Sequence, residues 1–127
     1  MKHLPTIAAA LLGLAFIVFG LNFFLQFLPM PMPPEGSPPA MFMGAMYVTG
    51  YLAFVKVLEI AGGVFVLLPA TRSIGLLILG PILINILAYH LYLMGGEGLL
   101  GVPLVLAILA LFLLWTKRTA FLALVTK

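Results

Sequence analysis

The chain has 127 residues, of which 65% are hydrophobic and only 7% are charged, and its net charge is +3. A soluble domain has about 25% charged and about 45–50% apolar residues, so this composition excludes an ordinary soluble enzyme. The six Lys and Arg residues are scattered, which argues against a nucleic-acid-binding protein. The absence of cysteine excludes disulfides, thiol relays, Fe–S clusters and Cys-ligated zinc.

Four stretches approach the length of about 20 apolar residues that a transmembrane helix needs. They cover residues 5–28, 45–68, 73–94 and 99–115. The first is longer than the apolar region of a signal peptide, and no small-residue cleavage site follows it. None has the polar face of a helix in a soluble protein. We therefore predict an all-α membrane protein with one domain, an antiparallel bundle of four transmembrane helices.

The connections differ in length and composition. Six prolines lie between Pro29 and Pro39, and they predict an extended outer loop because proline lacks the backbone donor of a helix. We expect a short interfacial helix at about 40–46, before the second span. The segments LPATRS and GGEG are short turns, and short turns place successive helices antiparallel.

The positive charges predict the orientation in the membrane. The side that carries both termini and the second connection holds five cations, Lys2, Arg72, Lys117, Arg118 and Lys127. The opposite side holds Glu35 and Glu97 and no Lys or Arg. Because cytoplasmic loops are enriched in Lys and Arg, we expect both termini to face the cytoplasm.

An acidic and a basic residue lie within the second span. Lys56 and Glu59 are three residues apart, so they share one face of the helix and should point into the bundle. Ionisable residues inside a membrane are costly, and they are candidates for functional sites. The pair could neutralise itself and fix helix packing. Alternatively, it could anchor a ligand headgroup or carry a proton.

Three further polar residues are candidates. Asn22, Lys56 and Asn85 could form a hydrogen-bonded layer in the outer half of the bundle, either as packing contacts or as a ligand site. His90 follows Asn85 by five residues, so it points about 140° away from it. It suits either the water–lipid boundary or a proton or ligand contact at the outer face.

Few cofactors suit this chain. It has no phosphate-binding loop, no HExxH motif and no dinucleotide fingerprint, and its two histidines, one of them His3 near the N-terminus, argue against a bis-His haem. Thioethers suit Cu(I), but without His or Cys in the loop adaptable packing is the favoured role of the outer methionines, Met30, Met32, Met41, Met43 and Met46. We predict no metal site and no resident cofactor. A quinone is the one contact that stays open.

Three segments together resemble a known family. They are LGLAFIVFGLNFF, FVKVLEIAGGVFVLL and PILINILAYHLYL, and in this order they are similar to the DoxX-like family of small four-helix bacterial membrane proteins. The resemblance implies a bacterial inner-membrane location and, by the origin of the family name, a link to a thiosulfate:quinone oxidoreductase subunit. Some relatives are linked to thiol-redox assemblies. The family's recurring polar and small positions match Asn22, Lys56, Glu59, Gly62, Gly63, Asn85 and His90.

Three functions follow from these observations. The favoured one is a non-catalytic accessory or scaffold subunit, which contacts the lipid bilayer and either other membrane subunits or copies of itself. The second is a quinone-interacting subunit of a thiosulfate- or thiol-redox-linked oxidoreductase. The third is a transporter of a small solute or lipid, with Lys56 and Glu59 in its path. Transport would need an oligomer because four helices leave little room for a pathway.

Overall fold

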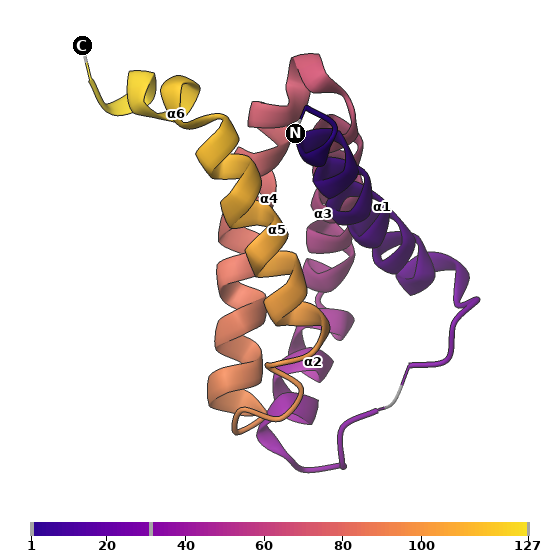
Figure 1. Ribbon diagram of the computed structural model, residues 1–127. Coiled ribbons are helices and arrows are strands. Elements are labelled where there is room, and N and C mark those ends of the chain that lie inside the picture. Colours follow the sequence, from indigo (N-terminus) through magenta and orange to yellow (C-terminus); the bar gives the residue numbers. More distant parts are fainter. Residues whose placement is uncertain (1, 31, 127) are drawn as a thin grey trace.

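The computed structural model describes residues 2–30 and 32–126, and its elements are helices (Figure 1). The long helices are α1 (Leu4–Leu25), α3 (Tyr51–Leu67), α4 (Arg72–Ala88) and α5 (Val102–Thr116). The shorter ones are α2 (Pro38–Val48) and α6 (Arg118–Val125), with a 3-10 turn η1 (Pro69–Thr71) and a π-helical turn η2 (Tyr89–Leu93). The predicted all-α class is confirmed for the described residues.

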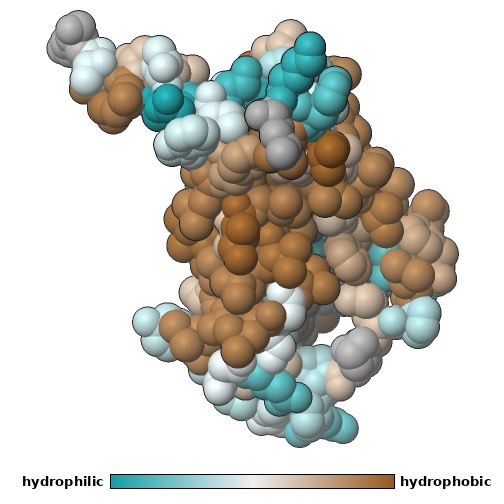
Figure 2. Space-filling model, viewed as in Figure 1, coloured by the Kyte–Doolittle hydropathy of each residue, from teal (hydrophilic) through white to brown (hydrophobic). Residues whose placement is uncertain are grey.

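Two helical stretches are long and apolar enough to cross a membrane on their own. They are α1, with 22 residues, and the continuous stretch Pro69–Leu93, with 25 residues. The pairs α2–α3 and α5–α6 are bent by 85° and 75°, and the number of spans rises to four if each pair counts as one. An apolar belt lies between polar ends of the molecule (Figure 2). The chain is therefore a small all-helical protein whose pattern fits a four-span membrane protein.

The four long helices pack as a ring in which neighbours alternate in direction. Helix α1 packs against α3 and α5, and α4 packs against the same two helices. Both ends of the chain lie at one end of the bundle, together with the connection between α3 and α4 (Figure 1). Helix α2 and the turn before α5 lie at the opposite end. This arrangement puts both termini and the second connection on the same side, as the sequence predicts for a four-span bundle.

All four long helices contribute to the core. Its largest fully enclosed side chains are Leu12 and Phe16 from α1, Val66 from α3, Leu79 from α4 and Leu113 from α5. Val66 and Leu113 lie near the ends of their helices and Leu12 lies in the first half of α1. The tightest packing is therefore nearer the end of the bundle that carries the termini.

Glycines allow the backbones of neighbouring helices to touch. A Cβ on Gly13 would lie 2.8 Å from the carbonyl oxygen of Gly63, and a Cβ on Gly63 would lie 2.7 Å from that of Gly13. On the other side of α3, a Cβ on Gly75 would lie 2.7 Å from the carbonyl oxygen of Gly62. The adjacent glycines Gly62 and Gly63 thus bring α3 close to α4 and α1, respectively, as small residues do between membrane helices.

The second expected span is broken near its start. The stretch predicted over 45–68 divides at Thr49 and Gly50, and Gly50 has a φ of 82°. The Thr49 hydroxyl donates to the Ala45 carbonyl at 2.8 Å, so a carbonyl in the last turn of α2 is bonded within the helix itself. Glycine adopts this left-handed conformation without a steric penalty. The short helix expected at 40–46 is present and longer, and it lies at 85° to α3.

The outer loop is shorter than the proline content suggests. Helix α2 begins at Pro38, so the last two prolines of the run are helical, contrary to the expectation for Pro29–Pro39. The Ser37 hydroxyl accepts a hydrogen bond from the Ala40 amide at 3.4 Å. Proline fits the first helical positions because their amides have no intrahelical partner. The outer-loop residue Pro31 lies outside the described residues.

The remaining helix ends differ from the expectation by a few residues. Helix α1 ends at Leu25 rather than at residue 28, and α4 with η2 covers 72–93, close to the expected 73–94. Helix α5 begins at Val102 rather than at residue 99, because the turn before it contains three glycines with positive φ, at 95, 96 and 98. Helix α6 was not predicted, because eight residues are too few for a span.

Candidate functional site

The two oppositely charged residues of α3 form an ion pair in the middle of the helix. The Lys56 ammonium lies 3.5 Å from both carboxylate oxygens of Glu59. Glu59 is 4% exposed, whereas the Lys56 side chain is 21% exposed. Their spacing of three residues makes this contact possible on one helix face. The carboxylate is therefore enclosed by the protein, and the ammonium reaches toward its edge.

Helix α1 closes one side of this region. A Cβ on Gly20 would lie 3.3 Å from the carbonyl oxygen of Lys56 and 2.5 Å from the side chain of Ile60. The backbone of α1 therefore passes directly beside the charged turn of α3. Among the described residues, no group of three or more His, Cys, Asp or Glu side chains could hold a metal ion. Lys56 and Glu59 therefore form a local ion pair beside the backbone of α1.

Asn22 is buried and is used locally. Its side-chain oxygen accepts from the Leu28 amide at 2.7 Å, and its backbone oxygen accepts from the Gln26 amide at 2.7 Å. Gln26 has a φ of 51°, so its backbone adopts the left-handed conformation that ends a helix. Asn22 thereby stabilises the end of α1, which explains why the helix stops at Leu25 instead of continuing to residue 28.

Asn85 is exposed on the outer surface of α4. Its side-chain amide donates to the Pro81 carbonyl at 2.8 Å, within the same helix. Among the described residues, no hydrogen bond joins Asn85, Lys56 and Asn22. The structure therefore does not build the polar layer that the sequence made feasible, because Asn85 points outward and Asn22 is committed to the end of α1.

His90 lies in the π-helical turn η2, at the end of the bundle opposite the termini. Its Nδ1 lies 2.9 Å from the Ile86 carbonyl oxygen, and its ring packs edge-to-face on Tyr89 at 5.2 Å. Tyr89 in turn contacts Phe42 of α2, with 5.7 Å between ring centroids. A Cβ on Gly98 would lie 3.4 Å from the His90 ring. The histidine therefore packs beneath the GGEG turn. No hydrogen bond or ion pair among the described residues joins it to Lys56 or Glu59.

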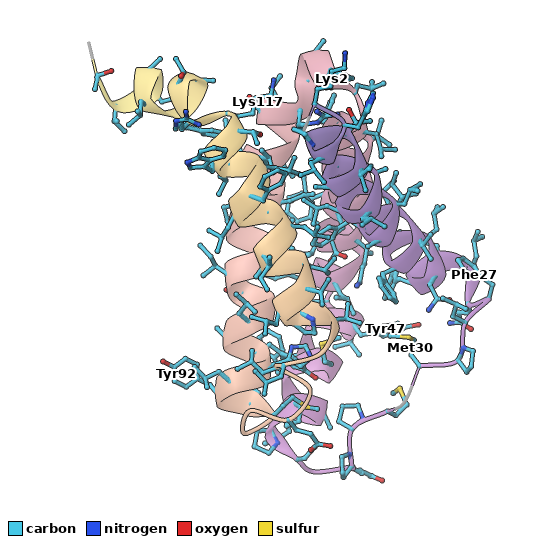
Figure 3. All side chains as sticks on the ribbon, viewed as in Figure 1. Lys2, Phe27, Met30, Tyr47, Tyr92 and Lys117 are labelled. Carbon is cyan, nitrogen blue, oxygen red and sulfur yellow. The ribbon has the colours of Figure 1, made fainter. Side chains whose placement is uncertain are left out.

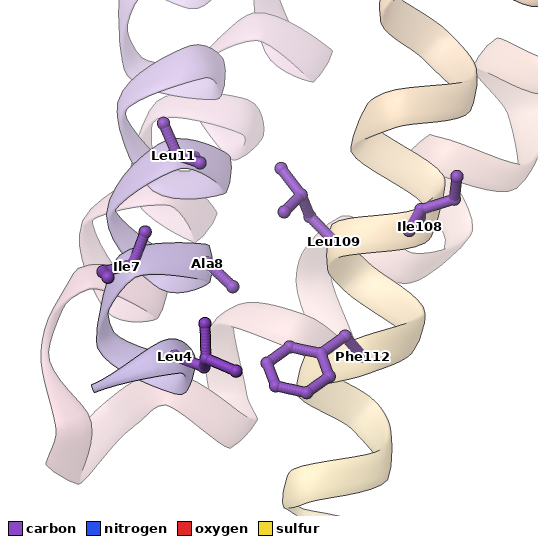
Figure 4. A pocket seen from close by; sticks show the side chains of 7 residues that line it. All are labelled: Leu4, Ile7, Ala8, Leu11, Ile108, Leu109 and Phe112. Atoms are coloured by element: carbon purple, nitrogen blue, oxygen red, sulfur yellow. The ribbon is translucent and has the colours of Figure 1, made fainter. Parts of the chain in front are cut away.

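Apolar grooves lie on the surface of the described residues, and the two that follow do not include the charged pair. One, of about 350 Å³, lies between α1 and α5 (Figure 4). It is lined by Leu4, Ile7, Ala8, Leu11, Ile108, Leu109 and Phe112. The other, of about 400 Å³, lies between α4–η2 and the start of α5, and Tyr92 is its one residue with a polar side-chain atom. Ligand sites normally combine apolar walls with polar groups that orient the ligand. These grooves are almost entirely apolar, so they suit hydrocarbon chains.

Two structural roles at the end with the termini are not apparent from the sequence. Arg72 is buried, and its Nε donates to the Val66 carbonyl at 2.8 Å while Nη2 donates to that of Leu67 at 3.4 Å. It binds the last carbonyls of α3, a favourable place for a cation. Arg118 stacks over the Trp115 ring at 4.4 Å. The spacing Trp-x-x-Arg would have been the signal for that contact.

No family model matches the chain, and no curated protein or solved structure matches it. The class of this protein therefore rests on its own residues. The helices are apolar on the outside, the buried Glu59 is paired with Lys56, and the ends are polar (Figure 2). These features define a small, multi-span, all-helical membrane protein in contact with the lipid bilayer.

Proposed function

We propose that the chain is a DoxX-like protein of the bacterial inner membrane that acts as an accessory or scaffold subunit, and that α4 contacts a helix of another subunit. The observation that carries this proposal is the outward-facing Asn85, on a surface that is otherwise apolar. Its exposed neighbours on the same helix include Leu77, Pro81 and Ile84. A carboxamide in this position needs a partner that lipid does not offer.

The depth of Asn85 supports a contact within the membrane. Asn85 follows Arg72 by 13 residues, or about 20 Å along α4. The hydrocarbon core is about 30 Å thick, so Asn85 lies well inside it if Arg72 marks one boundary. The side-chain NH2 group of Asn85 donates a hydrogen bond to the Pro81 carbonyl, while its side-chain oxygen has no donor among the described residues. An N–H or O–H group on a neighbouring helix would satisfy that oxygen, as polar residues do between membrane helices.

The experiment maps the neighbours of α4 in native membranes. A photo-crosslinking amino acid is placed at Ile84, which is 67% exposed beside Asn85, or at Leu111 on α5, which is 64% exposed. We expect protein crosslinks from Ile84 and mainly lipid adducts from Leu111. The crosslinks from Ile84 should fall severalfold when Asn85→Leu is added, because the interhelical hydrogen bond is lost.

The identity of the crosslinked protein separates two forms of the proposal. A different membrane protein would indicate an accessory subunit, and a second copy of the chain would indicate a self-associating scaffold. Equal protein crosslinking from Ile84 and Leu111, or crosslinking that Asn85→Leu leaves unchanged, would contradict the role of this α4 surface.

The other two functions have less support in the geometry. A ligand site for a quinone headgroup would need Asn22, Lys56 and Asn85 to lie together, and these three side chains do not converge. A transport path would need polar groups along the bundle axis, whereas the enclosed core of the described residues is dominated by Leu, Ala, Phe and Val. The accessory role requires neither arrangement.

A further inference from the structure

Helix α6 has a geometry that the accessory function does not use. It is bent by 75° from α5, and Figure 1 shows it extending sideways at the end of the bundle that carries the N-terminus. If α5 crosses the membrane, a helix turned this far lies close to the plane of the membrane surface. The bend is anchored by Phe121, which packs against the core, while the rest of the helix extends beyond it.

The side chains of α6 are divided between two faces. At 100° per residue, Phe121, Leu122, Leu124 and Val125 fall on one side together with Arg118, the first residue of the helix, and Thr119, Ala120 and Ala123 fall on the other. Leu122, Leu124 and Val125 are all strongly exposed, so nothing in the described part of the chain covers them. Such a helix fits a membrane interface with its large apolar side chains toward the acyl chains, while the long side chain of Arg118 at its first turn reaches the headgroups.

Positive charge gathers where α6 begins. Lys117 and Arg118 form the junction with α5, and Lys2 lies at the same end of the molecule (Figure 3). The three acidic residues of the sequence, Glu35, Glu59 and Glu97, all lie elsewhere. Among the described residues, no Asp or Glu therefore lies at the cationic end, which complements an anionic surface.

Trp115 marks the boundary level at this end. Its ring is largely exposed at the end of α5, and Arg118 both stacks on it and donates to its carbonyl oxygen at 2.8 Å. Tryptophan is enriched at water–lipid interfaces, where an apolar ring and a polar N–H are both satisfied. The stacked Arg118 is therefore held at the depth of the lipid headgroups.

We propose that α6 is an interfacial helix that inserts Leu122, Leu124 and Val125 into the lipid on the side of the termini, and that Lys117 and Arg118 bind anionic phospholipid headgroups there. The occupant of this surface is the bilayer itself. The inference is independent of α4 and of any partner subunit.

The first test measures the depth of α6 in the full chain. Because the chain lacks cysteine, a single one at Leu124 or at Thr119 gives a unique site for a spin label in lipid nanodiscs. We expect Leu124→Cys to be accessible to dissolved oxygen and protected from a water-soluble nickel complex, and Thr119→Cys to show the reverse. Equal exposure of both labels to the nickel complex would overturn the interfacial placement.

The second test measures lipid selectivity with the single tryptophan, Trp115, as the probe. Brominated phosphatidylglycerol and brominated phosphatidylcholine are compared as quenchers at equal mole fraction. We expect phosphatidylglycerol to be enriched over phosphatidylcholine beside Trp115 by at most about fivefold per cation. This enrichment should decrease as the salt concentration is raised. The variant Lys117→Gln/Arg118→Gln should bring the two quenchers to parity, while the control Thr119→Ala keeps the preference.

Two outcomes of the quenching experiment would refute the proposed lipid binding. One is equal quenching by both lipids in the unaltered protein. The other is a preference that the double variant retains. If Leu124 is instead protected from both reagents only when a water-soluble protein is added, α6 is a protein-docking helix and the lipid proposal fails.

Discussion

At the residue scale, the carboxylate of Glu59 is enclosed by helices that are otherwise apolar. Glu59 is almost fully buried, and Lys56 is the cation that offsets its charge at 3.5 Å. Removing one partner of a buried pair leaves an uncompensated charge, while removing both leaves none. The cost of a single substitution should therefore exceed that of the double one.

This reasoning leads to a prediction for the ion pair. Glu59→Gln should lower the stability of the detergent-solubilised protein by about 3 kcal/mol, because the Lys56 ammonium loses its counter-charge. Glu59→Gln combined with Lys56→Met should recover a large part of that loss. Thermal unfolding measures the difference, and Glu97→Gln in the exposed outer turn is the control. Identical melting temperatures for the wild type, the two Glu59 variants and the control would show that the ion pair does not contribute to stability.

Asn22 and Asn85 show how one residue type takes two roles. Asn22 is buried and bonds the chain that leaves α1, whereas Asn85 faces outward and bonds only its own helix. Both lie in apolar helices, and their hydropathy is the same. The difference depends on which side of each helix is covered by neighbours, and a hydropathy profile does not contain that information.

At the element scale, α3 is held by close backbone contact with two helices. Gly63 touches α1 at Gly13, and Gly62 touches α4 at Gly75. Lipid chains are as apolar as leucine, so burial of apolar surface provides little force between membrane helices. Tight packing at glycines provides attraction instead, which makes these positions sensitive to the addition of a single methyl group.

A substitution at the α1–α3 crossing tests this packing. Gly63→Ala should destabilise the protein by about 1–3 kcal/mol, because its Cβ would lie 2.7 Å from the Gly13 carbonyl oxygen. Gly44→Ala in α2 is the matched control, since a Cβ there meets nothing within 4 Å. It should be neutral or slightly stabilising, by up to about 1 kcal/mol. Chemical denaturation in detergent compares the two, and an equal effect of both substitutions would refute the packing argument.

At the scale of the whole molecule, the two ends of the bundle differ in charge. Lys2, Arg72, Lys117 and Arg118 belong to the end with the termini, and Glu35 and Glu97 belong to the opposite connections. Lys127 has the same expected side but lies outside the described residues. The asymmetry follows the distribution of Lys and Arg in multi-pass membrane proteins, so both termini are expected in the cytoplasm.

Reporter fusions test this orientation. Alkaline phosphatase, which is active only outside the cytoplasm, should be inactive when it is fused to the C-terminus and active when it is inserted after Gly96 in the outer turn. A fluorescent protein that folds only in the cytoplasm should be fluorescent when it is fused to the C-terminus. Strong phosphatase activity from the C-terminal fusion would reverse the assignment.

The sequence alone determined the class of the protein and the rough positions of its helices. Long apolar stretches can be stable only in lipid or in a large core, and this chain is too short for such a core. The contact between Lys56 and Glu59 was also predictable, because residues three apart on one helix must be neighbours. These conclusions depend on composition and on local spacing, which the order of residues contains directly.

Only the tertiary structure decided which polar residues meet and where the helices bend. Gly50 could have remained helical, but it adopts a φ of 82° and turns α2 across α3. Asn85 could have faced Asn22, but the close glycine contacts of α3 with α1 and α4 set the rotation of the helices and leave it outside. The bend that sets α6 across α5 likewise depends on Phe121 reaching the core. Such outcomes depend on contacts between distant segments, and these form only when the helices pack together.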